Sequence, residues 1–278
     1  MGKELSLTEQ LCYNTTRIES IRNDGSVVYG TGFFVGAERE DDTTSLLLVT
    51  NRHVIKDSKE LRFCLTIKDG KGNPIDTDKM EVIIDEPIPR SVSHPNKDVD
   101  LSVVFVTKAI VDLSLQLGKE PYYKHFPLSM IATREQMNKL DAMEDVIMVG
   151  YPVGLWDSVN NRPIFRRGIT ATDPKVDFEG KKEFLIDCAC IWGSSGSPVI
   201  RNEHTIDSNS IQLIGIQYAM PTHKISGRLE VVDTDSNKIV IPTSDIPINI
   251  GYIIKAECIF DILREVEKRY PLKFKYPM

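Results

Sequence analysis

Cysteine is scarce in this sequence, and a long apolar run is missing altogether. The 278 residues include 5 cysteines, an odd number at irregular spacing, and the N-terminal segment MGKELSLTEQL has no apolar stretch of the kind that an export signal needs. Such cysteines are typical of free thiols rather than of a disulfide framework. No apolar run approaches the roughly 20 residues of a membrane span. We therefore expect a cytoplasmic protein that does not enter a membrane.

A concentration of positive charge is also missing. The chain has 34 Lys and Arg residues against 40 Asp and Glu residues, a formal net charge of −6. Nucleic-acid-binding proteins instead collect Lys and Arg on one face. This balance argues against a nucleic-acid partner. With 41% hydrophobic and 27% charged residues, the composition is that of a folded protein with its own core.

What the sequence does contain is two groups of short strand-like segments. They are rich in Val, Ile, Phe and Thr and are separated by clusters of Gly, Pro, Asn and Asp, a pattern typical of antiparallel barrels and sandwiches. The first group covers 26–36, 45–55, 60–67, 80–85 and 100–106, and the second covers 145–154, 164–172, 183–191, 197–200, 211–220 and 248–256. The spacing predicts a mostly β protein with two strand-rich halves.

Two further segments have helical patterns. Good helix formers and a capping box at Thr133 predict a helical segment between the halves, over 108–144. Apolar residues at i, i+3, i+4 and i+7 from Ile259 predict an amphipathic helix over 257–270, which Pro271 ends. We expect its apolar stripe to pack on the second half.

The segment WGSSGSPV, residues 192–199, has the composition of a nucleophile loop. Gly193 and Gly196 flank Ser195. On such a loop the N–H groups of Gly193 and Ser195 point into one small space, where they would bind the oxyanion of a tetrahedral intermediate. The alternative for this segment alone is a flexible turn. A serine nucleophile also requires a base, and the base requires a carboxylate that fixes its tautomer.

His53 and Asp100 are the candidates for that base and that carboxylate. His53 alone among the histidines follows a strongly apolar strand, in LLLVTNRHVI, although a histidine that merely caps a strand is the alternative for it alone. Asp100 directly precedes the apolar run LSVVFV, where a half-buried carboxylate stays ionised beside an imidazole. Asp98 is its competitor, in a more polar context. The remaining histidines are expected to be solvated: His94, His125, His204 and His223.

Three segments, VTNRHV, DVDLSVV and WGSSGSPV, resemble in this order the signature segments of the chymotrypsin-like (trypsin-like) serine peptidases, and most of all those of the HtrA/Deg branch. Further similar segments, such as GTGFFV and GYPVGL, extend the resemblance over most of 29–254. The resemblance implies two six-stranded antiparallel β-barrels with the site between them. It also implies His53 as general base, Asp100 as its orienting carboxylate, Ser195 as nucleophile, and Gly193 with Ser195 as oxyanion hole.

The resemblance further implies how the chain is organised. The expected parts of a single peptidase domain over 1–278 are an N-terminal barrel (10–107), a linker or insertion (108–144), a C-terminal barrel (145–256) and a C-terminal helix (257–270). No PDZ domain of the HtrA/Deg type is expected after them. Regulation would then come from loops, from oligomerisation or from a protein partner, with 108–144 and 224–246 as the expected contact segments.

Two serines depart from the family pattern. Ser194 stands where the secreted members have an Asp that pairs with a newly cut N-terminal amine, so we do not expect activation by N-terminal cleavage. Ser197 stands where the family usually has a second Gly, and its Cβ is expected to be tolerated. Neighbouring charged residues usually lie on the surface, so Arg166 and Arg167 are expected to form a charged surface pair. The alternative is that they contact the substrate.

The resemblance also places a substrate pocket. Its expected residues are Ala189, Trp192, Tyr218, Ala219, Met220 and Gly251. No carboxylate stands at the base to bind Lys or Arg, so we expect cleavage after a small or medium uncharged apolar residue. Cys188 and Cys190 have no second Cys or His pair at zinc-like spacing and are expected to be buried thiols, with no metal or other cofactor.

The expected function is that of a serine endopeptidase that cleaves protein or peptide substrates through an acyl-enzyme. Two alternatives stay open. One is a catalytically silent member of the same fold that binds a peptide without cutting it. The other is an effector that stays inactive until a regulatory partner reorders the loop around Gly193.

Overall fold

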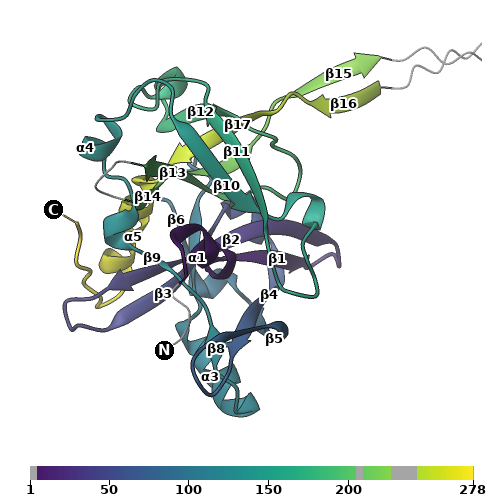
Figure 1. Cartoon of the computed structure of the whole chain (residues 1–278), viewed down its shortest axis with the longest axis vertical. Coiled ribbons are helices and arrows are strands. Elements are labelled where there is room, and N and C mark those ends of the chain that lie inside the picture. The colour runs from purple at the N-terminus through teal and green to yellow at the C-terminus, as the bar shows by residue number, and fades with distance from the viewer. Residues whose placement is uncertain (1–4, 205–208, 227–242, 278) are drawn as a thin grey trace, which may run out of the picture.

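The structure, a computed structural model, describes residues 5–204, 209–226 and 243–277 (Figure 1). Within these ranges the chain is mainly β, with two strand-rich halves and a C-terminal helix. This confirms the fold class that the spacing of the strand-like segments predicted. No helix of the described ranges is long and apolar enough to cross a membrane.

The first half is one sheet in the order β5-β4-β1-β2-β3-β7-β6, with β8 (Pro121–Tyr122) paired to β4 and β9 (Phe126–Pro127) paired to β2. The bounds of its main strands are β1 (Thr15–Arg22), β2 (Val27–Glu38), β3 (Thr44–Thr50), β4 (Ser58–Lys68), β5 (Pro74–Asp85), β6 (Ser91–Ser93) and β7 (Ser102–Phe105). The sheet has nine strands rather than six, because the short strands β6, β8 and β9 add to it. Strand β3 is buried along nearly its whole length because it lies between β2 and β7.

The second half closes into a six-stranded antiparallel barrel, in the order β10-β11-β12-β17-β14-β13. Its strands are β10 (Asp145–Gly150), β11 (Ile164–Thr170), β12 (Glu183–Asp187), β13 (Pro198–His204), β14 (Asn209–Ala219) and β17 (Ile250–Lys255). Ile254 of β17 is paired with Ile216 of β14 on one side and with Glu183 of β12 on the other. All six strands therefore have two neighbours, which removes free sheet edges.

Residues 108–144 contain helices, as expected, and also two short strands. The helices are α3 (Thr107–Leu117) and α4 (Arg134–Met137), and the predicted capping box begins α4. Between them, β8 (Pro121–Tyr122) and β9 (Phe126–Pro127) join the first sheet.

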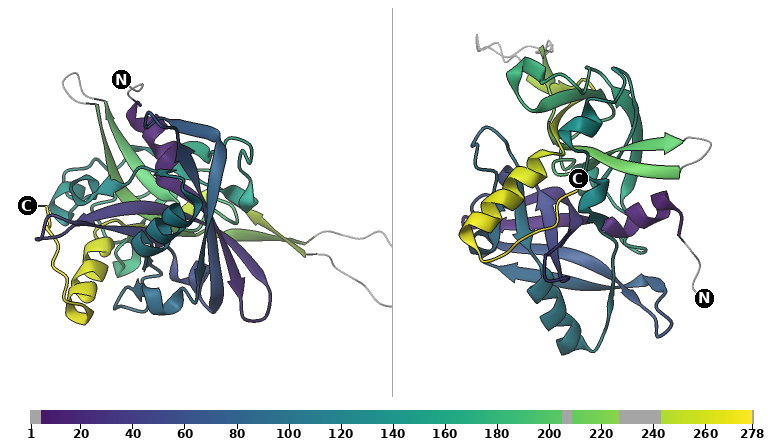
Figure 2. Two further views of the ribbon diagram at one scale, coloured as in Figure 1. Left: turned by 90° about the horizontal axis from the view of Figure 1, so that it is seen from below. Right: turned by 90° about the vertical axis from the view of Figure 1, so that its left-hand side faces the viewer.

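A hairpin projects from the body of the molecule (Figures 1 and 2). It consists of β15 (Thr222–Ser226) and β16 (Thr243–Pro247), which pair only with each other among the described residues. The hairpin includes the ends of the 224–246 segment in which we expected partner contacts. The remainder of that segment, 227–242, lies outside the described residues.

The N-terminal elements were not predicted from the sequence. Helix α1 (Leu7–Asn14) begins with a capping box formed by Ser6 and Glu9, a signal that the sequence contains. Strand β1 (Thr15–Arg22) has few apolar residues, so its pattern is weak, and it is held as a strand by hydrogen bonding to β2 and β4 on its two sides. Tertiary pairing here overrides local propensity.

The C-terminal helix α5 (Cys258–Arg269) forms where it was expected. Its buried apolar side chains belong to a core cluster that also contains Val49 of β3 and Leu213 of β14. The helix therefore packs at the junction of both halves and not on the second half alone (Figure 2). Two other clusters fill the interior of each half separately, one around Phe63 and one around Phe184.

Candidate active site

His53 and Asp100 are brought together by two paired strands. His53 lies on the short helix α2 (Arg52–Ile55), which begins two residues after β3 ends, and Asp100 lies two residues before β7 begins. Since β3 pairs with β7, the two residues meet at one end of the pair. His53 Nδ1 hydrogen-bonds Asp100 Oδ2, and the His53 backbone N–H donates to Oδ1 at 3.0 Å. Asp98, the competing carboxylate, is exposed.

The carboxylate of Asp100 is stabilised in its charged form. Burial by itself raises the pKa of Asp100, but the hydrogen bonds and the charge of His53 outweigh it, so the net pKa is lowered. An ionised Asp100 favours the His53 tautomer with its proton on Nδ1. That tautomer leaves Nε2 free to accept a proton.

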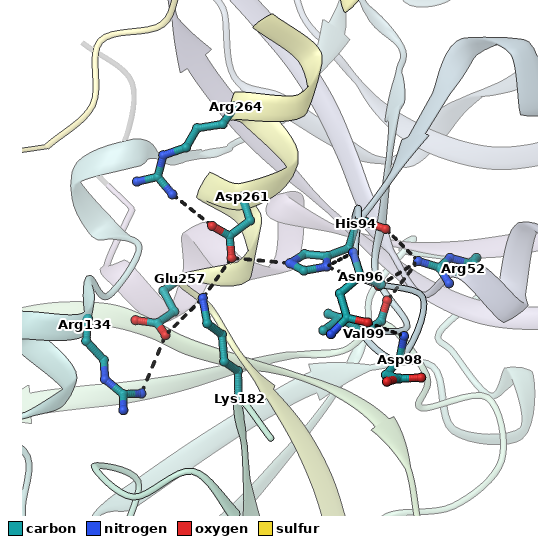
Figure 3. A network of polar contacts seen from close by, with 10 residues as sticks. All are labelled: Arg52, His94, Asn96, Asp98, Val99, Arg134, Lys182, Glu257, Asp261 and Arg264. Carbon is teal, nitrogen blue, oxygen red and sulfur yellow. Dashed lines mark hydrogen bonds and ion pairs between the residues drawn. The ribbon is translucent and has the colours of Figure 1, made fainter. Parts of the chain in front are cut away.

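The loop that carries Asp100 is bound by the two residues before His53, of which Figure 3 shows Arg52. Arg52 donates from its guanidinium to the carbonyl oxygens of His94 at 2.9 Å and of Val99 at 3.1 Å. Asn51 Nδ2 donates to the Asp100 carbonyl at 2.7 Å. Arg52 and Asn51 could not be predicted as site residues, because nothing in their local pattern shows which loop they reach.

His94 is buried, with 7% of its surface exposed, so the prediction of a solvated side chain was wrong. Its Nδ1 contacts both the N–H of Asn96, at 3.1 Å, and the carbonyl oxygen of Asn96, at 3.3 Å, while its Nε2 donates to Asp261 Oδ2 of α5 at 3.4 Å. The hydrogen bond from His94, together with Lys182 at 2.9 Å, lowers the pKa of Asp261. The loop before Asp100 is thus tied to the C-terminal helix (Figure 3).

The ligand atoms of His94, Cys258 and Asp261 lie within 4.8 Å of one another, which is close enough to consider a metal. The hydrogen bonds argue against one. A metal at His94 Nε2 would displace the proton that Nε2 donates to Asp261, and the Lys182 ammonium already neutralises Asp261. The three residues form a polar contact between the loop and α5.

Ser195 lies on the loop between β12 and β13, so it comes from the second half. Its Oγ is directed at the Tyr218 carbonyl at 3.4 Å, and no hydrogen bond joins it to His53 in the described part of the chain. The Gly196 backbone has φ +89°, and a Cβ there would lie 1.9 Å from the Thr31 carbonyl oxygen. Only glycine therefore fits directly after Ser195.

The N–H groups of Gly193 and Ser195 have no hydrogen-bond partner among the described residues. The Val153 N–H donates to the Trp192 carbonyl. Because the C=O and N–H of a trans peptide point in opposite directions, this contact turns the Gly193 N–H away from Val153. Both N–H groups are thus without an acceptor in the described structure, and their role as an oxyanion hole stays a prediction.

Thr31 of β2 joins the first half to this loop. Its N–H donates to the Ser195 carbonyl at 2.8 Å and its Oγ1 to the Gly193 carbonyl at 3.1 Å. The same Oγ1 accepts the Tyr151 N–H at 3.1 Å. Thr31 is fully buried. Its role could not be predicted from the sequence, because threonine is common in strands and its presence in one indicates no function.

Ser197 is fully buried without crowding the strand beside it. A Cβ at Gly150 of β10 would lie 2.1 Å from the Ser197 Oγ, so the missing side chain of Gly150 makes the room for this hydroxyl. Ser197 Oγ also donates to Thr31 Oγ1 at 3.3 Å.

The residues expected around a substrate pocket have different surroundings, and the pocket itself stays a prediction. Tyr218 contacts Ser195 Oγ through its carbonyl. A Cβ at Gly251 would lie 2.5 Å from the sulfur of Cys190. Ala189 and Trp192 are exposed, whereas Ala219 and Met220 are half-buried.

Cys188 and Cys190 are buried free thiols, as predicted. Burial raises the pKa of both, that of Cys190 to about 12.

Arg166 and Arg167 do not form a surface pair. Successive side chains of β11 point to opposite faces, so only Arg167 is exposed, where it pairs with Asp145 at 3.2 Å. Arg166 points inward, and its Nη1 donates to the Ala189 carbonyl at 2.6 Å and to Ser194 Oγ at 2.8 Å. The period-two alternation of strands is the signal that would have separated the two arginines.

Comparisons with known proteins identify a family and two similar solved structures. The family model of the trypsin-like peptidase domain matches residues 30–206. The HtrA-type protease AlgW, solved with a tripeptide, is 15% identical with a TM-score of 0.49, and the alignment covers 93% of this chain and 61% of AlgW. An inactive serine-to-alanine mutant of Rv3671c from M. tuberculosis H37Rv is 15% identical with a TM-score of 0.44. The alignment covers 93% of this chain and 88% of Rv3671c. No protein of curated function matches. Since the family model matches more than half of the chain, this protein belongs to the trypsin-like peptidase domain family.

Proposed function

We propose that this protein is a serine endopeptidase with Ser195 as nucleophile, His53 as general base and Asp100 as the carboxylate that orients it. The observation that supports this most is the double contact of Asp100, whose two oxygens bind the Nδ1 and the backbone N–H of the same histidine. A carboxylate that merely caps a helix would not need to fix the imidazole tautomer. Here the tautomer is the one that catalysis requires.

In the proposed reaction, His53 Nε2 takes the proton of Ser195 as its Oγ attacks the scissile carbonyl. The Ser195 side chain first rotates from the Tyr218 carbonyl toward the imidazole. The N–H groups of Gly193 and Ser195 bind the oxyanion of the tetrahedral intermediate. His53 then donates the proton to the leaving amine, and water hydrolyses the acyl-enzyme by the same route.

The proposed substrate is a protein or peptide cleaved after a small or medium uncharged apolar residue. Ala189 offers no carboxylate to a lysine or arginine, and the Arg166 guanidinium beside it would repel a cationic side chain. We also propose a reducing, cytoplasmic location, because all five cysteines are free. The two halves and the C-terminal helix would act as one catalytic unit.

One observation favours the partner-activated effector as a second candidate. Ser195 Oγ is bonded to the Tyr218 carbonyl rather than to His53. A partner that turned this hydroxyl toward His53 would then act as the switch.

Labelling with a fluorophosphonate probe tests the proposal. The native chain should be labelled covalently, and Ser195→Ala and His53→Ala should each abolish labelling, because the probe reacts only with an activated serine. Ser158→Ala, at an exposed serine, is the matched control and should label like the native chain. A folded native chain that stays unlabelled would count against a working nucleophile and for the effector or the silent binder.

A further inference from the structure

Arg166 is an unusual residue because its guanidinium faces the interior of the second half. A single nitrogen, Nη1, reaches both the Ala189 carbonyl at 2.6 Å and Ser194 Oγ at 2.8 Å. Ser194 is fully buried and stands between Gly193 and Ser195, the two residues whose N–H groups face no partner in the described structure. The side chain therefore touches the loop next to the proposed oxyanion site.

No carboxylate of the described residues balances the Arg166 charge. The groups whose negative charge would act on Arg166 are the thiolates of Cys188 and Cys190. Burial raises the pKa of both thiols, so they are protonated and carry no charge. Its Nε and Nη2 atoms are buried and have no hydrogen-bond partner in the described structure. A half-buried cation whose buried nitrogens have neither a counter-ion nor an acceptor is unfavourable for stability, so a stabilising role in the fold does not explain this arrangement.

We propose that Arg166 is a positioning residue that holds the loop 189–195 in the form in which the Gly193 and Ser195 N–H groups are free to bind an oxyanion. Nη1 joins the start of this loop, at Ala189, to its end, at Ser194. Within the loop, the Ser194 N–H donates to the Ile191 carbonyl at 3.1 Å and closes the turn that contains Gly193. The inference rests on the proposed function.

Arg166 acts through the loop and does not touch the reacting atoms. Without its side chain, Ser194 Oγ and the Ala189 carbonyl lose their shared donor, and the contact of the Val153 N–H with the Trp192 carbonyl is then less supported in holding the direction of the Gly193 N–H. Loss of one oxyanion donor typically slows acyl transfer by about 10²- to 10³-fold. The effect belongs in kcat rather than in KM, because the oxyanion forms only in the transition state.

The test compares Arg166→Met with Arg167→Met, the neighbouring arginine whose side chain is exposed. We expect Arg166→Met to lower kcat for a peptide substrate by about 10²-fold with KM within about 3-fold of native. Arg167→Met should leave both within about 2-fold. Ser194→Ala should lower kcat as well, and the double variant should be no worse than Arg166→Met alone, because the two residues act through one contact.

Amide hydrogen exchange gives a readout that needs no activity. Deuterium uptake by a peptide that spans 189–195 should rise in Arg166→Met and stay unchanged in Arg167→Met. If Arg166→Met does not fold, Arg166→Lys and Ser194→Ala carry the same comparison.

The outcomes separate this inference from the proposed function. A native chain that the fluorophosphonate probe fails to label contradicts the proposed function, while exchange over 189–195 still decides the role of Arg166. Unchanged exchange in Arg166→Met overturns the inference, whether or not the native chain is active. The inference is also overturned if Arg166→Met changes only KM, raising it for substrates with an acidic residue before the scissile bond. Such a result would mean that Arg166 contacts the substrate.

Discussion

At the scale of single residues, the proposed site depends on three consecutive side chains. Asn51, Arg52 and His53 directly follow a buried strand, and all three contact the loop that carries Asp100. Asp100 is therefore positioned by hydrogen bonds to its carbonyl and its loop as well as by its own carboxylate. An asparagine at position 100 would therefore occupy the same position as Asp100. Its amide, however, would no longer favour the His53 tautomer with the proton on Nδ1.

Asp100→Asn should lower kcat by about 10⁴-fold, because the amide favours the wrong imidazole tautomer, and should leave the fold intact. Asp98→Asn is the matched control, since Asp98 is exposed two residues away, and it should stay within a few-fold of native. Steady-state kinetics on a peptide substrate measures both variants. Equal activity of Asp100→Asn and the native chain would contradict the assignment of the carboxylate.

At the scale of elements, α5 is tied to the loop before Asp100 through one hydrogen bond between side chains. Asp261 accepts from His94 and from Lys182, and both contacts hold its pKa below the ordinary value for an aspartate. A carboxyl group whose folded-state pKa is depressed stabilises the native state above its unfolded pKa of about 3.9. That stabilisation is lost as the pH falls through that value toward the lower folded-state pKa.

Asp261→Asn should therefore lower the free energy of unfolding by about 2 kcal/mol at pH 7, and by progressively less as the pH falls below about 4. Urea unfolding between pH 3 and 7, followed by circular dichroism, measures both quantities. Asp112→Asn, at an exposed residue of α3, is the control and should change little. A constant difference across this pH range would contradict the proposed ionisation of Asp261.

At the scale of the whole molecule, the two halves share a core. One cluster contains side chains of β3, of β14 and of α5, so neither half is packed independently of the other at the junction. Thr31 adds hydrogen bonds from β2 to the loop that carries Ser195. Because His53 comes from one half and Ser195 from the other, the shared core also fixes their relative position.

Leu263→Ala on α5 should lower the free energy of unfolding by about 2–5 kcal/mol, because Leu263 is fully buried in the shared cluster and its truncation leaves a cavity. Its effect should appear in both halves. Hydrogen exchange in β3 and in β14 should accelerate together. Leu115→Ala, at an exposed leucine of α3, is the control. Acceleration in only one half would show that the halves unfold separately.

The sequence by itself determined the strands with strong patterns, the C-terminal helix and the identity of the candidate triad residues. The strands follow from alternation and turn residues, which are local signals. The triad candidates follow from three motifs in a fixed order, so no knowledge of distant contacts is needed for either prediction. Strand β1 was not predicted, because its sequence pattern is weak and its stability comes from pairing with β2 and β4 on its two sides.

Only the tertiary structure decided which polar residues are buried and what they bind. His94 was expected to be solvated and Arg166 to lie on the surface, yet one is joined to Asp261, 167 residues away, and the other to Ser194, 28 residues away. Thr31 reaches Gly193 over 162 residues. The local sequence sets which groups a side chain offers, whereas the packing of the two halves and α5 sets the partner, because burial and hydrogen bonding depend on residues far along the chain.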